Sequence, residues 1–191
     1  MKFGKMVVVV AALGLGQAAM AQGVDGAAAG QALFSPKDVG VEVVKHGFLL
    51  QEQFQILASV AADQPYYGAI AVSPDEGLMS EATVAAANYH SVEAASAAAL
   101  GGCDAARKGA GTCVIVAYIR PKGWQARSVQ LSADATRAFS KDYGGKGAAL
   151  AVSAGTGTWA MAKGATASEA AIAACGAKLT GPNDCTVVIA D

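Results

Sequence analysis

The sequence is poor in the side chains that carry out chemistry in most enzymes. Its 191 residues include only two histidines, His46 and His90, and charged side chains make up 15% of the chain. A nucleophile–histidine–acid set needs three partners within hydrogen-bond reach of one another. No third member of such a set is recognisable near His90. We therefore expect a non-enzymatic protein with no catalytic residues and no cofactor.

Other absences exclude further classes of protein. The formal net charge is -1, so the basic surface of a nucleic-acid-binding protein is missing. The cysteines form neither the close pairs of a structural zinc site nor a C-x-x-C redox motif. The segment Gly155–Ala160 formally matches G-x-G-x-x-A, but the side chains after it alternate as in a strand. This favours a hairpin over the helix that a dinucleotide site requires.

The N-terminus has the pattern expected of an export signal. An apolar run of ten residues, Met6–Leu15, follows a basic start and precedes Ala19-Met20-Ala21. This order is typical of a secretory signal peptide, and the run has only about half the length of a membrane span. We predict a signal peptide over 1–21, cleavage between Ala21 and Gln22, and no membrane anchor after cleavage. The protein is then a periplasmic or secreted bacterial protein.

All four cysteines follow the predicted leader. They are Cys103, Cys113, Cys175 and Cys185. An even number of cysteines in an exported chain predicts disulfides, and four cysteines permit three pairings. Nine residues separate the members of the first pair and of the second, which favours Cys103–Cys113 and Cys175–Cys185. Closing so short a loop contributes about 2–3 kcal/mol on the loop-entropy model.

The second half of the chain contains an internal repeat. Two apolar segments, 68–73 and 149–153, each end in a serine that a glycine follows four residues later. The alanine-rich segments 96–103 and 168–175 also match, and each ends in a cysteine. A β-branched strand follows the second cysteine of each pair. The pattern predicts two ββαβ units, with Gly77 in a hairpin turn where φ is free to be positive.

The repeat sets the predicted organisation of the domain. We expect an α+β fold with a duplicated domain over 66–191, in which each ββαβ unit has its own disulfide. Repeat one covers 66–119, a linker covers 120–146, and repeat two covers 147–191. Gly157 is expected to occupy a turn equivalent to that of Gly77. Within the linker we predict a strand over 128–131, followed by a helix from Ser132 to about Tyr143.

The segments ahead of the repeat have less pattern. Residues 22–34 are rich in glycine and alanine without a period, so we expect a flexible lead-in. The segment 35–65 is expected to be helical. Ser35, Pro36 and Asp38 favour a helix start, and this helix is predicted to end at His46. A second helix is predicted over 48–61.

The chain resembles a family of small exported bacterial domains of unknown function. The resemblance rests on the G-A-I-A-V-S strand, the alanine-rich helix, the Cys-x9-Cys pair and the V-x-V strand, and it covers roughly 67–191. It implies an exported, disulfide-bonded α+β domain and no known activity. Relatives are sometimes labelled aminolevulinate synthase. That label does not fit, because such an enzyme needs a large pyridoxal-phosphate fold.

Three hypotheses about function follow. The first is a non-enzymatic binding or structural module for an unknown ligand or envelope protein, with Tyr89, His90 and Trp159 as candidate ligand contacts. The second is a small periplasmic hydrolase that uses His90 with nearby hydroxyl groups. The third is an inhibitor or stress factor that acts through the loops 104–112 and 176–184. Two turn carboxylates, Asp75 and Glu76, are expected to be solvated.

Overall fold

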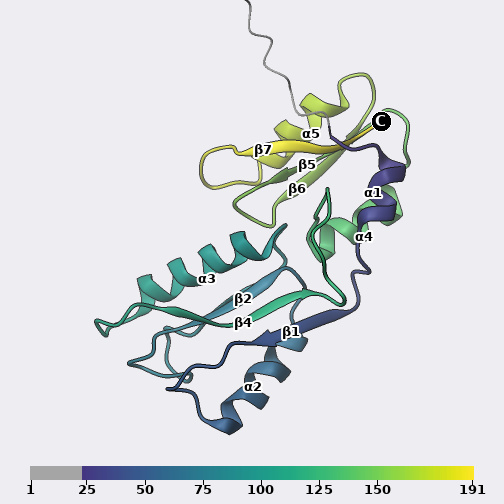
Figure 1. Ribbon diagram of the computed structural model, residues 1–191. Coiled ribbons are helices and arrows are strands. Elements are labelled where there is room, and N and C mark those ends of the chain that lie inside the picture. Colours follow the sequence, from purple (N-terminus) through teal and green to yellow (C-terminus); the bar gives the residue numbers. More distant parts are fainter. Residues whose placement is uncertain (1–22) are drawn as a thin grey trace, which may run out of the picture.

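A computed structural model describes residues 23–191 and shows an α+β protein with two antiparallel sheets (Figure 1). The four-stranded sheet has the order β1-β4-β2-β3, and the three-stranded sheet has the order β6-β5-β7. The predicted fold class is therefore confirmed. The helices are α1 (Gly26–Ala32), α2 (Gln51–Ala62), α3 (Val92–Ala106), α4 (Ala133–Asp142) and α5 (Ala167–Gly176). The strands are β1 (Val39–Val43), β2 (Gly68–Val72), β3 (Val84–Ala86), β4 (Val114–Pro121), β5 (Ala148–Ser153), β6 (Trp159–Lys163) and β7 (Cys185–Ala190).

The predicted signal peptide and the cleavage site at Ala21 and Gln22 lie outside the described residues. None of the helices within residues 23–191 combines the length and apolar composition that a bilayer-spanning helix needs.

The two ββαβ units repeat each other down to the strand register. Strand β2 lies between β3 and β4, and strand β5 lies between β6 and β7. In both sheets the register of the central strand shifts at the same point, after Ile70 in one and after Leu150 in the other. Val72 pairs with Val114 as Val152 pairs with Thr186. A shared irregularity of this kind supports duplication, since bulges disrupt the ladder and are positioned features of a fold.

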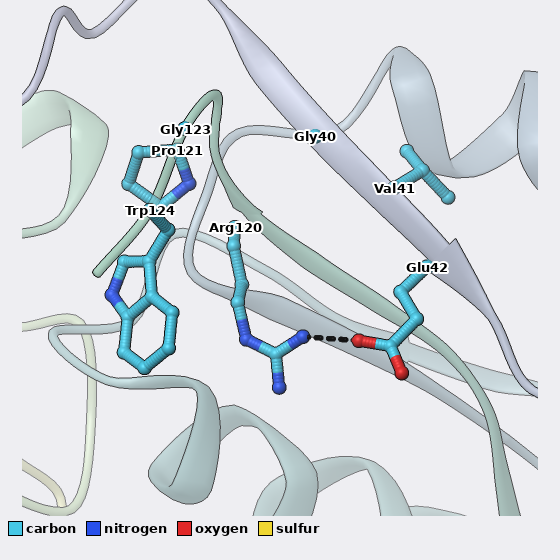
Figure 2. Close-up of a pocket in the computed structure, with 7 residues that line it drawn as sticks. All are labelled: Gly40, Val41, Glu42, Arg120, Pro121, Gly123 and Trp124. Atoms are coloured by element: carbon cyan, nitrogen blue, oxygen red, sulfur yellow. Dashed lines mark hydrogen bonds and ion pairs between the residues drawn. The ribbon is translucent and has the colours of Figure 1, made fainter. Parts of the chain in front are cut away.

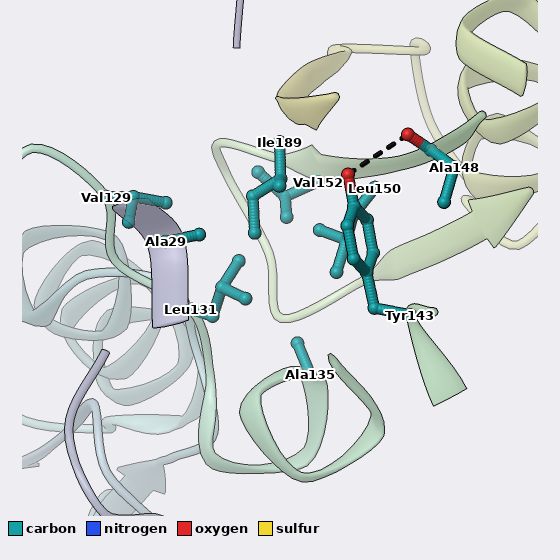
Figure 3. Close-up of a cluster of buried hydrophobic side chains, with 9 residues drawn as sticks. All are labelled: Ala29, Val129, Leu131, Ala135, Tyr143, Ala148, Leu150, Val152 and Ile189. Carbon is teal, nitrogen blue, oxygen red and sulfur yellow. Dashed lines mark hydrogen bonds between the residues drawn. The ribbon is translucent and has the colours of Figure 1, made fainter. Parts of the chain in front are cut away.

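Each repeat includes one more helix than the sequence pattern indicates. Five residues lie between α2 and β2, and five lie between α4 and β5. Leu57 and Ala61 of α2 pack against the face of β2 and β4 that α3 leaves free. Ala135 of α4 packs on the equivalent face of the second sheet, beside Leu150 (Figure 3). The repeating unit is thus αββαβ, and it takes in parts of the predicted helical segment and linker.

Both disulfides have the predicted pairing. Cys103 bonds to Cys113 and Cys175 bonds to Cys185, with 6.1 Å between the Cα atoms in each pair. Each bond joins the last turns of a helix to the chain that enters the following strand. The sulfurs lie in small-residue clusters beneath α3 and α5.

The predicted flexible lead-in over 22–34 was wrong, because much of this segment packs on repeat two. The Asp25 carboxylate accepts a hydrogen bond from the Ala28 amide at 2.7 Å and caps α1. Ala29 is fully buried beside Ile189 (Figure 3). Val24 pairs with Ile189 in an isolated parallel bridge. The small size of alanine and glycine permits this close packing. Their sequence shows no apolar periodicity, so the sequence pattern does not indicate the packing.

The predicted helix over 35–46 was also wrong, since β1 occupies this place. Val39, Val41 and Val43 all pack against the cluster beneath α2. β-Branched residues suit a pleated, half-buried strand, and β1 pairs antiparallel with β4 along its whole length. The second helix of the segment is present as α2.

The predicted strand over 128–131 is not formed. Val129 and Leu131 are buried in the cluster between α1, α4 and the second sheet, in a segment without regular secondary structure (Figure 3). The alternation of apolar residues therefore reflects burial without a pairing partner. The helix predicted from Ser132 is present as α4, and the Ser132 hydroxyl caps it by accepting from the Ala135 amide at 3.2 Å.

Candidate functional site

His90, the strongest catalytic candidate in the sequence, lies where the two repeats meet. The residue is 6% exposed. The Nδ1 atom lies 3.0 Å from the backbone nitrogen of Ser132, and Nε2 lies 3.0 Å from the carbonyl oxygen of Thr158. Because the Ser132 amide can only donate, Nδ1 is the acceptor and the proton is on Nε2. The ring thus joins repeat one to α4 and to the β5–β6 turn of repeat two.

This environment keeps His90 neutral. Burial in the junction lowers the pKa of the imidazole below its ordinary value of 6.5, and the Thr158 carbonyl only partly opposes this effect. Protonation would place a second hydrogen against the Ser132 amide, where an acceptor is needed. Both ring nitrogens are therefore engaged in holding the repeats together, and neither is available to a substrate.

The backbone around His90 packs closely against repeat two. A Cβ atom on Gly157 would overlap the carbonyl oxygen of Asn88, so only glycine fits at this position. Gly77 has the positive φ that its turn predicts, +74°. Gly157 does not share that feature, and its requirement is the close approach of the two repeats. The Asn88 side chain also bonds to both the carboxylate and the backbone amide of Asp134.

Tyr89 and Trp159, the other two candidate contacts, do not form a common site with His90. Tyr89 packs in the cluster beneath α3, and Trp159 packs in the cluster on α4's side of the second sheet. The Lys178 ammonium lies 5.1 Å from the centre of the Trp159 ring and donates to the Trp159 carbonyl at 2.8 Å. None of the three candidates lines either of the two hollows described below.

The turn carboxylates of repeat one hold its disulfide loop. Asp75 is exposed and Glu76 is partly exposed, so both are also in contact with solvent, as expected. Glu76 accepts from the backbone amides of Lys108 at 2.8 Å and Gly109 at 3.0 Å. The Asp75 carboxylate accepts from the Gly111 amide at 2.8 Å. The amides of Gly109 and Lys108 hold the pKa of Glu76 below its ordinary value. These carboxylates therefore fasten the segment between Cys103 and Cys113 to the β2–β3 turn.

Repeat two also has a carboxylate that joins its disulfide loop to the neighbouring turn, but the positions of acid and amide are exchanged. Here the acid is in the disulfide loop, where Asp184 accepts from the amide of Gly155 in the β5–β6 turn at 2.8 Å. The nearby Ser153 hydroxyl and the Gly155 amide lower the pKa of Asp184. The two loops proposed to act on a partner are thus both fixed to the turns beside them.

A shallow recess on the outer sheet edge of repeat one has the polar groups suited to a ligand (Figure 2). Arg120 of β4 lies at its centre, with its guanidinium 4.8 Å from the Tyr118 ring centre and 5.3 Å from that of Trp124. Its Nη1 atom donates to Glu42 of β1 at 2.7 Å. The recess has a volume of about 480 Å³ and is lined by Gly40, Val41, Glu42, Arg120, Pro121, Gly123 and Trp124.

The recess presents both donors and acceptors. The Arg120 side chain is 24% exposed and that of Glu42 is 64% exposed. Within the described residues, the guanidinium's one hydrogen bond is to Glu42, and the buried Nε has no partner. The sequence could not reveal this site, because Glu42 and Arg120 are 78 residues apart. They meet only through β1, in a segment predicted to be helical.

Among residues 23–191, no three histidine, cysteine, aspartate or glutamate side chains converge as metal ligands.

The chain was also compared with known proteins. No family model, no curated protein and no solved structure matches it. The family resemblance therefore stays a prediction.

Proposed function

We propose that this protein is an exported, non-enzymatic binding module that acts in the periplasm or outside the cell. The two disulfides indicate a non-reducing environment. The predicted signal peptide supports export. The duplicated scaffold, with each disulfide loop fixed to a turn, gives a rigid support for a binding surface.

The observation that carries the binding role is the state of Arg120. Two aromatic rings and one carboxylate hold its guanidinium in place, and such preorganisation lowers the entropic cost of binding. One oxygen of Glu42 and the second guanidinium Nη remain available, so the pair offers an acceptor and a donor side by side. The charges of the pair cancel, which disfavours a strongly ionic ligand.

These features suit a neutral ligand that is rich in hydroxyl groups. A hydroxyl both donates and accepts, so neighbouring hydroxyls of a carbohydrate can satisfy Glu42 and Arg120 together. Trp124 supplies an apolar surface beside them, as indole rings do at many interfaces. A shallow recess at a sheet edge also leaves room for a chain to continue past it. We therefore propose a carbohydrate as the ligand.

The hydrolase hypothesis has less support. It depends on His90 as a general base, and a base must reach the proton that it removes. The imidazole is buried and both its nitrogens are bonded to the backbone.

The proposal is tested by titrating the protein with soluble oligosaccharides of glucose and of N-acetylglucosamine. The indole N–H signal of Trp124 is followed by NMR, and that of Trp159, which lies outside the recess, is the internal reference. We expect saturable shifts of the Trp124 signal alone. Glu42→Ala should weaken binding about tenfold or more, because a hydrogen bond to a charged group contributes about 1.5–3 kcal/mol.

The matched control is Glu52→Ala, which removes an exposed carboxylate from α2 and should leave binding unchanged. Absence of any saturable shift with both oligosaccharide series would refute carbohydrate binding at the recess. Equal loss of binding in the two variants would refute the role of the Glu42–Arg120 pair.

A further inference from the structure

The two repeats differ at one sheet edge. In repeat one, β1 pairs with the outer edge of β4 over five residues. On the equivalent edge of β7 only Val24 pairs within residues 23–191: its amide donates to the Val188 carbonyl and its carbonyl accepts from the Ala190 amide, both at 3.0 Å, which leaves the edge before Val188 open. The Val44 amide donates to the equivalent carbonyl of repeat one, that of Val116, at 2.9 Å, but β1 is antiparallel to β4 whereas Val24 forms a parallel bridge. Within residues 23–191 no strand continues the sheet beyond β7 (Figure 1).

A hollow of about 660 Å³ lies beside this open edge, between α5 and β7. Its volume is in the range of ligand sites. The lining residues are Gly23, Ser168, Glu169, Ile172, Cys185, Thr186, Val187, Val188, Ala190 and Asp191.

The duplication explains why the hollow exists in repeat two. Tyr118 pairs with Ala69 in the first sheet, and Ala190 pairs with Ala149 in the second. The two positions are therefore equivalent. The Tyr118 ring packs against the cluster beneath α3, whereas Ala190 ends at its methyl group. An aromatic ring that is built into repeat one is thus missing from repeat two.

The charge of the lining restricts what the hollow can accept. Its two charged side chains are Glu169 of α5 and Asp191, and the lining contains no basic residue. A second copy that approached through its own β7 would bring the same two carboxylates to the contact, and like charges at close range repel. The complementary occupant carries lysine or arginine beside its apolar group.

We propose that the α5–β7 hollow and the adjoining edge of β7 bind an extended peptide segment of a partner protein. The segment pairs with β7 as an added strand, a known mode of peptide recognition. It places an aromatic side chain in the space that Ala190 leaves, and a basic residue beside Glu169. The proposal is independent of carbohydrate binding, because the hollow is in repeat two and the recess in repeat one.

The test uses a random dodecapeptide library displayed on phage, selected on the purified protein and counter-selected on Ala190→Tyr. This variant restores the ring that Tyr118 supplies in repeat one, so it should fold and should close the hollow. The matched control is Ala173→Tyr, which adds the same ring at an exposed position of α5 outside the lining. Near-ultraviolet circular dichroism establishes that both variants are folded.

We expect recovered peptides to share an aromatic residue with lysine or arginine close by. The best of them, made synthetically, should lose at least tenfold in affinity on Ala190→Tyr and nothing on Ala173→Tyr. Glu169→Lys should weaken it several-fold. Bound peptide should also slow hydrogen exchange of β7 amides.

Three results would overturn the proposal. The first is a selection that yields no peptide sensitive to Ala190→Tyr. The second is a set of sensitive peptides without basic residues. The third is a dimer in solution that Ala190→Tyr dissociates, which would identify a second copy of the chain as the occupant.

Discussion

Substitutions at His90 should lower the free energy of unfolding by amounts that depend on which of its two hydrogen bonds each variant keeps. We expect His90 to stabilise the fold and not to act as a catalytic residue. Asparagine places an oxygen near the position of Nδ1, so His90→Asn keeps an acceptor for the Ser132 amide and loses the bond to Thr158. Glutamine reaches the position of Nε2, so His90→Gln keeps a donor for Thr158 and leaves the buried Ser132 amide without an acceptor. His90→Ala loses both bonds and leaves a cavity.

The expected losses in the free energy of unfolding follow from these contacts. One ordinary hydrogen bond contributes about 0.5–1.5 kcal/mol, and an unsatisfied buried donor costs about 1–3 kcal/mol. We therefore expect about 1 kcal/mol for His90→Asn and about 2 kcal/mol for His90→Gln. For His90→Ala we expect about 3–4 kcal/mol once the cavity is included. Urea denaturation at pH 7.5, with both disulfides intact, measures all three.

The pH dependence gives a second measurement of the same contacts. The pKa of His90 is lowered in the folded protein, so the unfolded chain binds a proton more readily. Its contribution to stability is complete above about pH 6.5 and is lost as the pH falls from there through the lowered pKa. The slope is at most about 1.4 kcal/mol per pH unit. It should be absent from His90→Asn, and equal slopes in the two proteins would refute this account of His90.

Four further variants test the packing and the loops. Gly157→Ala should destabilise the protein by about 1–3 kcal/mol through overpacking against Asn88. Gly101→Ala, at an exposed helix position with open space around it, should stabilise the protein by about 0.5–1 kcal/mol. Thermal denaturation of the two variants measures whether each change has the expected sign. Replacing Cys175 and Cys185 together by serine should cost about 2–3 kcal/mol, and a loss well below 1 kcal/mol would show that the cross-link constrains little. The Glu76 carboxylate should stabilise the folded protein above about pH 4.5, and this stabilisation is lost as the pH falls through the lowered pKa of Glu76. Glu76→Gln should lack this pH-dependent contribution. An acid-denaturation curve identical to that of the unsubstituted protein would contradict the bonds to Lys108 and Gly109.

The features that could be predicted from the sequence are encoded over short spans. The disulfide pairing follows from equal spacing of the cysteines, and the ββαβ units follow from self-similarity. The predicted helix begins at Ser132, whose hydroxyl accepts from an amide three residues ahead. Each of these signals lies within a few residues of the structure that it specifies.

The features that were missed depend on distant partners. The segment of β1 begins with residues typical of a helix start, and only pairing with β4, about 80 residues away, makes it a strand. The helices α2 and α4 occupy equivalent places although their sequences show no repeat, because covering a sheet needs only an apolar face. His90 and Arg120 both contact residues that are far away in the sequence, so no local sequence pattern predicts their environments.

Native and intact mass spectrometry of the protein recovered from producing cells tests the central claim most directly. An exported binding module predicts a chain that begins at Gln22 and gains about four mass units on reduction, two for each disulfide. It also predicts a retained ligand mass that Glu42→Ala loses and Glu52→Ala keeps. A chain that still carries residues 1–21, has free thiols and retains no ligand would contradict the account.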